Sequence, residues 1–292
     1  MVIATEWLEA CRPRTLVAAL VPVLLASALA ARAEVFHPLA ALLCLLFAVL
    51  LQIGTNFAND YYDGIKGTDG AGRLGPRRGV GSGAISASRM KDAMVGVLGA
   101  AFLVGLGLVT FGGWWLLPLG LLFIALAVGY TGGPYPLAYL GLGDLFVLIF
   151  FGPVATLLTY YVQAGEFSMS SFLLGLGSGA LASNLLVVNN VRDMDLDRLH
   201  GKRTTAVRFG RFFSIKQYFF STVFALLVPG LLLLCGIGPV VLFASLVLLA
   251  PGLHLCIALA RSKPQQCNRL LAQTGKFLIA YCLLLSLLLV IS

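Results

Sequence analysis

Long apolar stretches separated by short polar segments dominate the chain. They predict nine membrane-spanning helices, at residues 15–32, 38–59, 92–111, 115–130, 144–163, 171–190, 213–235, 238–260 and 273–291. A helix needs roughly 20 apolar residues to cross a bilayer, and most of these stretches are about that long. They lack the polar stripe that a soluble helix turns toward water. The predicted fold is therefore all-α and integral to the membrane, a bundle of about nine helices in a single domain over residues 1–292.

Composition supports a membrane protein rather than a soluble helical one. The chain is 59% hydrophobic and 11% charged, whereas a soluble domain carries about 25% charged residues. Its six cysteines include no C-x-x-C pair, so they indicate neither a disulfide framework nor a zinc site. Arg12 and Arg14 before an apolar stretch imitate a secretory signal, but Glu6 and Glu9 argue against cleavage. We interpret this stretch as the first membrane helix.

The positive charges predict how the chain is oriented. The net charge is +8, and a cytoplasmic N-terminus would place every Lys and Arg except Arg32 on the cytoplasmic side. This is the distribution that the positive-inside rule describes, and a miscount of one helix would scatter it. The basic excess is thus explained by topology, so we expect no nucleic-acid partner.

Two polar segments follow the second and sixth apolar stretches, at residues 56–69 and 189–204. We expect both to form Asp-rich loops at the cytoplasmic ends of those helices. With an offset of 134 residues, Asn56 aligns with Asn190, Asn59 with Asp193, Asp63 with Asp197 and Gly67 with Gly201. The alignment predicts a weak parallel repeat of motifs at 56–69 and 190–204, and such duplicated halves often place a site between them.

The spacing inside each motif indicates a metal site. Residues four apart lie on one face of a helix, so Asn59 with Asp63, and Asp193 with Asp197, present two sets of oxygen ligands. Mg²⁺ prefers oxygen ligands and usually combines one or two carboxylates with phosphate oxygens of a substrate. Acidic residues contribute little to topology, so their position among the cations calls for a function.

Basic residues around the motifs suggest that the anion is a diphosphate. Arg side chains match phosphate oxygens with a planar fork, and Lys acts as a point charge. A diphosphate held by Mg²⁺ and cations is a good leaving group, and if its organic part is allylic, aromatic faces can stabilise the resulting cation. The candidate residues are Lys66, Arg73, Arg77, Arg78, Arg192, Lys202 and Arg203 for the diphosphate, and Phe57, Tyr61, Tyr62, Tyr130, Tyr135 and Tyr139 for the cation.

Seven segments in one order make the chain resemble the UbiA superfamily of intramembrane aromatic prenyltransferases, and within it the bacterial members that prenylate 1,4-dihydroxy-2-naphthoate for menaquinone. They are residues 7–16 (WLEACRPRTL), 54–63 (GTNFANDYYD), 66–69 (KGTD), 73–77 (RLGPR), 130–136 (YTGGPYP), 141–144 (GLGD) and 189–204 (NNVRDMDLDRLHGKRT). Leu137 and Ala138 stand where 4-hydroxybenzoate members have a Lys, which favours the naphthoate acceptor.

The resemblance implies a helical bundle around a central cavity in the bacterial inner membrane. It implies Mg²⁺-dependent transfer of a polyprenyl group from polyprenyl diphosphate to the naphthoate, with loss of CO₂ and diphosphate, giving demethylmenaquinone. The implied roles are metal binding by Asn59, Asp63, Asp193 and Asp197, of which the three Asp also count as catalytic; diphosphate binding by Lys66, Arg73, Arg77, Arg192 and Lys202; and acceptor or cavity contacts by Arg12, Asn56, Asn190 and Tyr130.

Several alternatives stay open at this point. Another aromatic acceptor, such as 4-hydroxybenzoate or homogentisate, would need the same site. Asp60, Asp63 and Gly64 match the start of a CDP-alcohol phosphotransferase motif, but the residues that should follow are missing. A transporter or channel would be expected to carry charges near the bilayer midplane, where these spans have almost none. Chain length (octaprenyl favoured), the number of Mg²⁺ ions, any general base and the oligomeric state are left undetermined.

Overall fold

The fold is helical throughout the part of the chain that the structure covers. The structure is a computed structural model that describes residues 2–68 and 74–292, and within these ranges it contains no β-strand. Its α-helices are α1 (Val2–Cys11), α2 (Pro13–Arg32), α3 (Pro38–Ile65), α4 (Ala87–Gly112), α5 (Leu116–Gly129), α6 (Gly143–Ile149), α7 (Ala155–Ala164), α8 (Met169–Leu199), α9 (Thr205–Leu232), α10 (Leu242–Arg261) and α11 (Cys267–Ile291). A π-helical turn, η1 (Phe150–Val154), joins α6 to α7, and three 3₁₀ turns are η2 (Leu233–Cys235), η3 (Pro239–Val241) and η4 (Pro264–Gln266).

The predicted membrane spans coincide with these helices. Of the helical segments described, eight are long and apolar enough to cross a membrane, and α5 is a shorter apolar helix. One of the eight, residues 143–164, combines α6, η1 and α7, and it is broken at Gly152, whose φ is −120° and ψ −114°. Pro153 follows and has no backbone N–H to donate at the break. The predicted all-α membrane fold is confirmed, whereas α1 was not predicted.

The motif-bearing helices are longer than the sequence pattern predicted. Helix α3 ends at Ile65 rather than near 59, and α8 ends at Leu199 rather than near 190. The predictions ended each helix where hydrophobicity falls, but backbone hydrogen bonds continue a helix through polar residues as well. Asp63, Asp193 and Asp197 therefore lie on helices, and their placement in loops was wrong.

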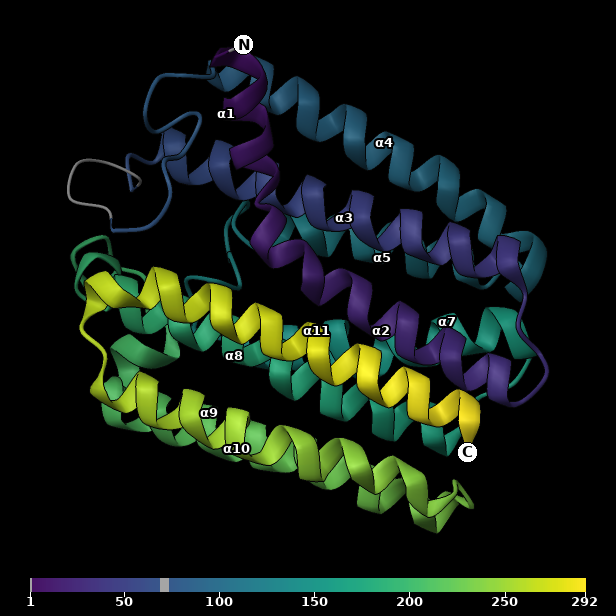
Figure 1. The fold of residues 1–292 in the computed structure, drawn as a ribbon. Coiled ribbons are helices and arrows are strands. Elements are labelled where there is room, and N and C mark those ends of the chain that lie inside the picture. Colours follow the sequence, from purple (N-terminus) through teal and green to yellow (C-terminus); the bar gives the residue numbers. More distant parts are fainter. Residues whose placement is uncertain (1, 69–73) are drawn as a thin grey trace.

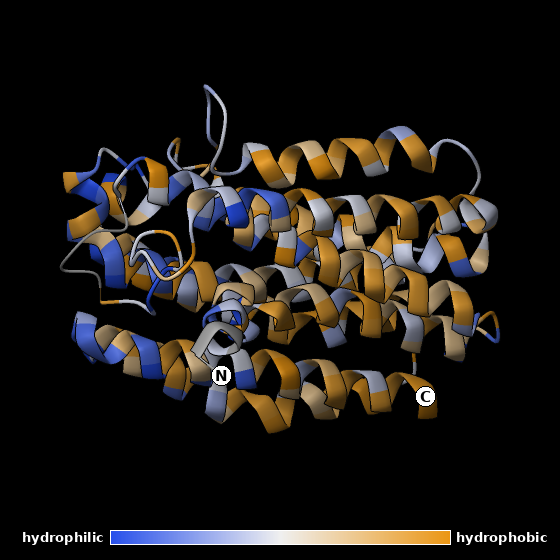
Figure 2. Ribbon diagram, turned by 90° about the horizontal axis from the view of Figure 1, so that it is seen from above, coloured by the Kyte–Doolittle hydropathy of each residue, from blue (hydrophilic) through white to orange (hydrophobic). Residues whose placement is uncertain are grey.

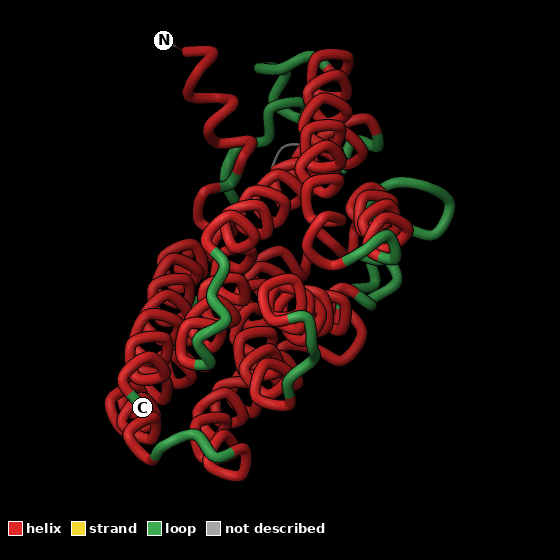
Figure 3. The backbone as a smooth tube through the Cα atoms, turned by 90° about the vertical axis from the view of Figure 1, so that its right-hand side faces the viewer, coloured by secondary structure: helices red, strands yellow, loops and turns green. Residues whose placement is uncertain are grey.

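The helices lie side by side as one elongated bundle. Helices α3 and α4 form one side, α9 and α10 form the other, and α2, α8 and α11 lie between them (Figure 1). The N-terminus lies near one end of the bundle and the C-terminus near the opposite end. In a view turned by 90°, helices account for most of the molecule (Figure 3), and the longest connections run from α3 to α4 and from α5 to α6.

One end of the bundle is hydrophilic. Hydrophilic residues concentrate at that end, and hydrophobic residues cover most of the remaining length (Figure 2). The basic residue predicted for the opposite side, Arg32, comes last in α2, and its guanidinium donates a 2.7 Å hydrogen bond to the hydroxyl of Ser292 near the C-terminus. Both motifs lie at the hydrophilic end, because α3 and α8 finish there.

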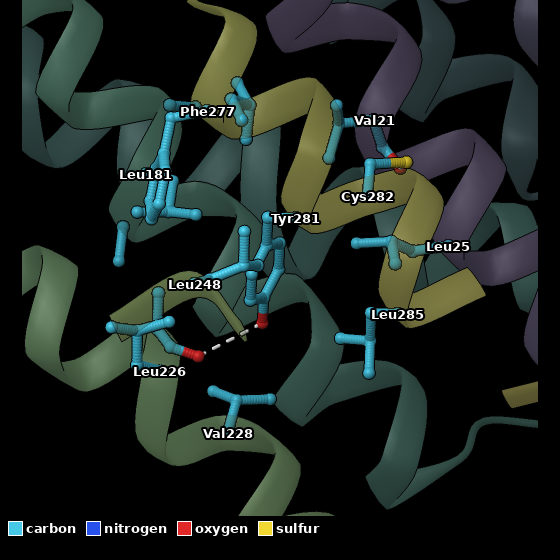
Figure 4. Close-up of a cluster of buried hydrophobic side chains, with 14 of the residues drawn as sticks. Val21, Leu25, Leu181, Leu226, Val228, Leu248, Phe277, Tyr281, Cys282 and Leu285 are labelled. Carbon is cyan, nitrogen blue, oxygen red and sulfur yellow. Dashed lines mark hydrogen bonds between the residues drawn. The ribbon is translucent and has the colours of Figure 1, made fainter. Parts of the chain in front are cut away.

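The half of the bundle formed by α8, α9, α10 and α11 holds the largest buried core. Tyr281 of α11 is fully buried, and its hydroxyl donates a 3.2 Å hydrogen bond to the carbonyl oxygen of Ala225 in α9 (Figure 4). Glycines bring α8 close to η1, since a Cβ on Gly152 would lie 2.6 Å from the carbonyl oxygen of Gly175. Small residues allow membrane helices to pack closely. This packing fixes α8, the helix that carries Asp193 and Asp197, against η1.

Candidate active site

Two cavities meet inside the bundle. One, of about 310 Å³, is lined by the polar residues of both motifs. The other, of about 270 Å³, is lined mainly by apolar side chains of α2, α3, α5, η1 and α7. Six residues line both cavities: Arg12, Thr15, Asn59, Tyr130, Leu186 and Asn189. The polar cavity therefore adjoins an apolar one that extends into the bundle.

The first predicted ligand pair, the amide of Asn59 and the carboxylate of Asp63, is held by residues from distant parts of the chain. Asn59 and Asp63 lie one turn apart near the end of α3, and the Asn59 side-chain oxygen accepts a hydrogen bond from the hydroxyl of Thr131. The two carboxylate oxygens of Asp63 accept hydrogen bonds from the hydroxyl of Tyr139 at 2.8 Å and from the ammonium of Lys202 at 2.9 Å. Asp63 is thus buried but fully partnered on both oxygens.

The contact between Tyr139 and the segment after α8 explains how Lys202 reaches Asp63. The backbone N–H of Arg203 donates to the carbonyl oxygen of Tyr139 at 3.0 Å. Gly141, with φ 73°, lies against the same backbone, and a Cβ there would come within 2.5 Å of the Arg203 carbonyl oxygen. Only glycine combines that conformation with so close an approach. The segment that follows α5 therefore fixes the position of Lys202.

The second carboxylate pair is held locally. Asp193 and Asp197 lie one turn apart on α8 and line the polar cavity. The guanidinium of Arg192 donates two hydrogen bonds to the Asp193 carboxylate, from Nε at 2.8 Å and from a terminal nitrogen at 2.7 Å. Its other terminal nitrogen donates to the side-chain oxygen of Asn268 at 2.8 Å. Arg192, predicted to bind diphosphate, is therefore turned toward Asp193 in this structure.

The remaining predicted cations divide into two groups. Arg77 and Lys202 line the polar cavity. Arg78 lines it too; the basic pattern made it a diphosphate candidate, but the family resemblance did not. Lys66 is exposed and does not line it; its ammonium donates to the carbonyl oxygen of Thr131 at 3.1 Å. The ammonium groups of Lys66 and Lys202 both lie over the ring of Tyr139, at 4.5 and 4.9 Å from its centroid. Arg73 lies outside the described residues.

The predicted acceptor and cavity residues lie around the junction of the two cavities. Asn190 lines the polar cavity and Asn56 the apolar one, where the Asn56 amide donates to the carbonyl oxygen of Cys11 at 2.9 Å. Arg12 and Tyr130 line both cavities, and Arg12, with φ 52°, forms the joint between α1 and α2.

Several residues of the site were not assigned these roles from the sequence. Tyr139 was expected only as an aromatic face, and nothing in the pattern singled out Thr131 or Asn268. Asp60, one residue after Asn59, is buried and also lines the polar cavity, but its two carboxylate oxygens accept hydrogen bonds from the backbone N–H groups of Gly79 at 2.9 Å and Val80 at 3.0 Å. The glycines at 75–83 were the one available signal that backbone would approach a carboxylate there.

The donor atoms of the two pairs fit Mg²⁺. Asn59, Asp63, Asp193 and Asp197 all line the polar cavity and offer only amide and carboxylate oxygens. Among the residues described, there is no cluster of three or more His, Cys, Asp or Glu side chains that could hold a metal ion by themselves. Mg²⁺ commonly takes only one or two carboxylates from the protein and completes its shell with phosphate oxygens. The pairs therefore suit a metal that arrives with an anionic substrate.

A polar cavity with both carboxylates and cations, next to an apolar cavity inside a membrane bundle, defines an intramembrane protein suited to amphiphilic anions. The chain matches the UbiA prenyltransferase family over residues 19–289. It is 42% identical over 219 residues to a 1,4-dihydroxy-2-naphthoate octaprenyltransferase of Haemophilus influenzae, covering 70% of each chain. It is also 42% identical over 212 residues to the protein of that name from Escherichia coli, covering 70% of this chain and 68% of the relative. The chain belongs to the UbiA prenyltransferase family, and it is an enzyme of the prenyltransferase class.

Solved structures share the fold at low sequence identity. The apo structure of a UbiA homolog from Aeropyrum pernix K1 matches with a TM-score of 0.68 at 16% identity, covering 90% of this chain and 96% of that one. A UbiA homolog from Archaeoglobus fulgidus bound to GPP and Mg²⁺ matches with a TM-score of 0.64 at 15% identity, covering 98% and 100% of the two chains. These matches confirm the intramembrane bundle.

Proposed function

We propose that this enzyme transfers a polyprenyl group from polyprenyl diphosphate to 1,4-dihydroxy-2-naphthoate, releasing CO₂ and diphosphate and forming demethylmenaquinol, the reduced form of demethylmenaquinone. The observation that carries the acceptor is the 42% identity, over 70% of the chain, to relatives named 1,4-dihydroxy-2-naphthoate octaprenyltransferase. Their name also makes an octaprenyl group the favoured donor.

The diphosphate would bind in the polar cavity. Asn59, Asp63, Asp193 and Asp197 would hold Mg²⁺, which neutralises negative charge and makes diphosphate a better leaving group. Arg77 and Lys202 supply positive charge from the cavity wall. We also assign diphosphate binding to Arg73, which follows the first motif, and to Arg192, which would act through Asp193 or directly on the substrate. Lys66, inside the first motif, would contribute less, because it is exposed and does not line the cavity.

The prenyl tail would occupy the apolar cavity. Aromatic rings line this cavity, beginning where it adjoins the polar one. The ring centroids of Tyr130 and Phe146 are 5.7 Å apart, and those of Phe146 and Phe150 are 4.2 Å apart. All three residues line the apolar cavity, and Tyr130 lines the polar one too. Aromatic faces stabilise positive charge without attacking it, and an apolar wall keeps away water that would capture an allylic cation.

The bond changes of the transfer are balanced without an added oxidant or reductant. The bond between C1 of the prenyl group and the diphosphate oxygen breaks, and its electron pair leaves with diphosphate. The ring carbon that bears the carboxylate uses its π electrons to bond to C1. Loss of that carboxylate as CO₂ returns an electron pair to the ring and restores its aromaticity. Arg12, Asn56, Asn190 and Tyr130 would orient the acceptor, and the phenol hydroxyl of Tyr130 would donate a hydrogen bond to it.

The same proposal places the enzyme in the bacterial cytoplasmic membrane with its N-terminus in the cytoplasm. The hydrophilic end of the bundle carries both motifs and the cations around them, whereas Arg32 lies toward the opposite end. The positive-inside rule assigns such an end to the cytoplasm. The substrates would then enter the polar cavity from the cytoplasmic side.

The test is a transfer assay with purified protein in detergent. Wild-type protein, Mg²⁺, 1,4-dihydroxy-2-naphthoate and labelled octaprenyl diphosphate should give CO₂ and demethylmenaquinol, which is detected as demethylmenaquinone after oxidation by air. Product should disappear with EDTA and with Asp193→Asn. If product forms only with 4-hydroxybenzoate, that compound is the acceptor and the naphthoate assignment is wrong. If folded protein prenylates neither compound, the proposal is refuted.

A further inference from the structure

A continuous line of hydrogen bonds runs from the second carboxylate pair to the segment that follows the first. Arg192 is bound to Asp193 by two of its nitrogens and to the side-chain oxygen of Asn268 by the third. The side-chain nitrogen of Asn268 donates to the carbonyl oxygen of Leu74 at 2.7 Å. Asn268 lies in the first turn of α11, so three separate parts of the chain meet at one amide.

The two partners of Asn268 fix the orientation of its amide. The Arg192 guanidinium can only donate, and the Leu74 carbonyl can only accept. A reversed amide would set its NH₂ against a donor and its oxygen against an acceptor, so both hydrogen bonds would be lost. With the amide as observed, Arg192 has a partner for each side of its fork, and only 3% of its side chain is exposed. Asn268 thus holds Arg192 in the orientation that pairs with Asp193.

The segment that begins at Leu74 carries two cations of the polar cavity. Arg77 and Arg78 line the cavity, and they lie between two anchored points. At one point the Leu74 carbonyl is held by Asn268, and at the other the N–H groups of Gly79 and Val80 are held by Asp60. The bond from Asn268 therefore anchors the start of this short segment.

We propose that Asn268 is a positioning residue for the diphosphate site: it locks Arg192 onto Asp193 and holds the segment carrying Arg77 and Arg78 beside the same cavity. It reaches the substrate through these groups and makes no contact with it. The inference rests on the proposed binding of prenyl diphosphate in the polar cavity. It predicts that loss of Asn268 weakens binding of the donor much more than binding of the aromatic acceptor.

Two substitutions separate the two hydrogen bonds. Asn268→Ala removes both, whereas Asn268→Asp keeps an oxygen for Arg192 but replaces the donor to Leu74 with a second acceptor. Gln265→Ala is the matched control, because Gln265 is an exposed amide just before α11 for which the structure shows no side-chain hydrogen bond. A hydrogen bond to a charged group contributes about 1.5–3 kcal/mol and a neutral one about 0.5–1.5 kcal/mol, and 1.4 kcal/mol corresponds to a factor of about ten.

Binding and kinetics are measured on the same detergent-purified proteins. Thermal stabilisation by geranyl S-thiolodiphosphate, an unreactive analogue of the donor, is titrated with Mg²⁺ present, and KM is measured for donor and acceptor. For half-maximal stabilisation, we expect Asn268→Ala to require at least roughly ten times the analogue concentration that wild type requires, and Asn268→Asp roughly three times that concentration. The donor KM should rise in parallel, with the acceptor KM and the unliganded Tm close to those of the Gln265→Ala control.

The outcomes separate this inference from the proposed function. Analogue affinity in Asn268→Ala and Asn268→Asp equal to wild type would overturn the inference while leaving the diphosphate site in place. An equal rise in both KM values, with a fall in unliganded Tm, would also overturn it, because it would show a merely structural role. Wild-type protein that is not stabilised by the analogue would refute the diphosphate site itself.

Discussion

The two predicted ligand pairs, Asn59 with Asp63 and Asp193 with Asp197, have the same spacing on similar helices, but the residues that hold them differ in kind. Asp63, on α3, depends on Tyr139 and Lys202, which are 76 and 139 residues away in sequence. Asp193, on α8, is paired with its immediate neighbour Arg192. Asp63 is thus held by residues distant in sequence, whereas Asp193 is bound by its helix neighbour Arg192, which is in turn bound from α11.

This difference shows that two repeated motifs can have equivalent residues with different hydrogen-bond partners. Asn59 and Asp193 occupy equivalent places in the predicted repeat, but one accepts a hydrogen bond from Thr131 and the other a guanidinium fork. The repeat itself stays a prediction. If each pair contributes to one diphosphate site, changes to remote residues should damage the first pair, and changes within α8 or α11 should damage the second.

The largest effect is expected when the carboxylate of the first pair is neutralised. Asp63→Asn removes the charge that Lys202 neutralises and a proposed metal ligand, so kcat/KM should fall by roughly 10²–10³-fold. Steady-state prenyl transfer measures it, with Asp92→Asn, an exposed carboxylate of α4, as the control. Activity within a factor of two of the control would remove Asp63 from the site.

Lys66 and Lys202, which both lie over the Tyr139 ring, test whether a positive charge must line the cavity to bind prenyl diphosphate. Lys202→Ala should raise the KM for prenyl diphosphate roughly tenfold or more, because the ammonium lines the cavity and is paired with buried Asp63. Lys66→Ala removes an equal charge near the same Tyr139 ring, but from an exposed position, so its effect should be less than about threefold. Equal effects of the two substitutions would contradict the distinction drawn here.

A smaller effect is expected from the hydroxyl group that supports Asp63. Tyr139→Phe keeps the ring under both lysines and removes only the 2.8 Å hydrogen bond to the carboxylate. The loss in kcat/KM should be roughly 5–30-fold, the range for a hydrogen bond to a charged group that is partly replaced by other partners. Tyr135→Phe, at an exposed tyrosine of the same connection, is the control. If Tyr139→Phe matches that control, the hydroxyl has no part in placing Asp63.

The smallest effect on turnover is expected at the neighbouring carboxylate, Asp60. Asp60→Asn keeps the shape of the side chain but leaves one acceptor for the two backbone N–H groups of Gly79 and Val80. Stability should fall by about 1–3 kcal/mol because a buried donor loses its partner. Thermal unfolding in detergent and limited proteolysis near residue 80 would measure it. Turnover reduced as strongly as in Asp63→Asn, at unchanged stability, would instead give Asp60 a direct role.

Much of the architecture could be predicted from local pattern. Apolar stretches about as long as a bilayer is thick predict membrane helices, because a buried backbone in lipid must satisfy its own hydrogen bonds. The spacing of Asn59 with Asp63, and of Asp193 with Asp197, predicts shared helix faces directly from the period of the helix. The helix ends were less predictable, since α3 and α8 continue past the point where apolar residues stop.

The partners of each side chain could not be predicted in the same way. Asp60 and Asp63 are both buried carboxylates on α3, and the sequence alone does not show that one binds backbone N–H groups while the other meets Lys202. Asn268 likewise has no distinguishing pattern around it. Hydrogen bonds between residues far apart in sequence depend on how helices and connections are packed, and that packing is a property of the folded chain. The pattern of the sequence therefore specifies the helices and the oxygen ligands, and the tertiary fold specifies which of those ligands face the cavity.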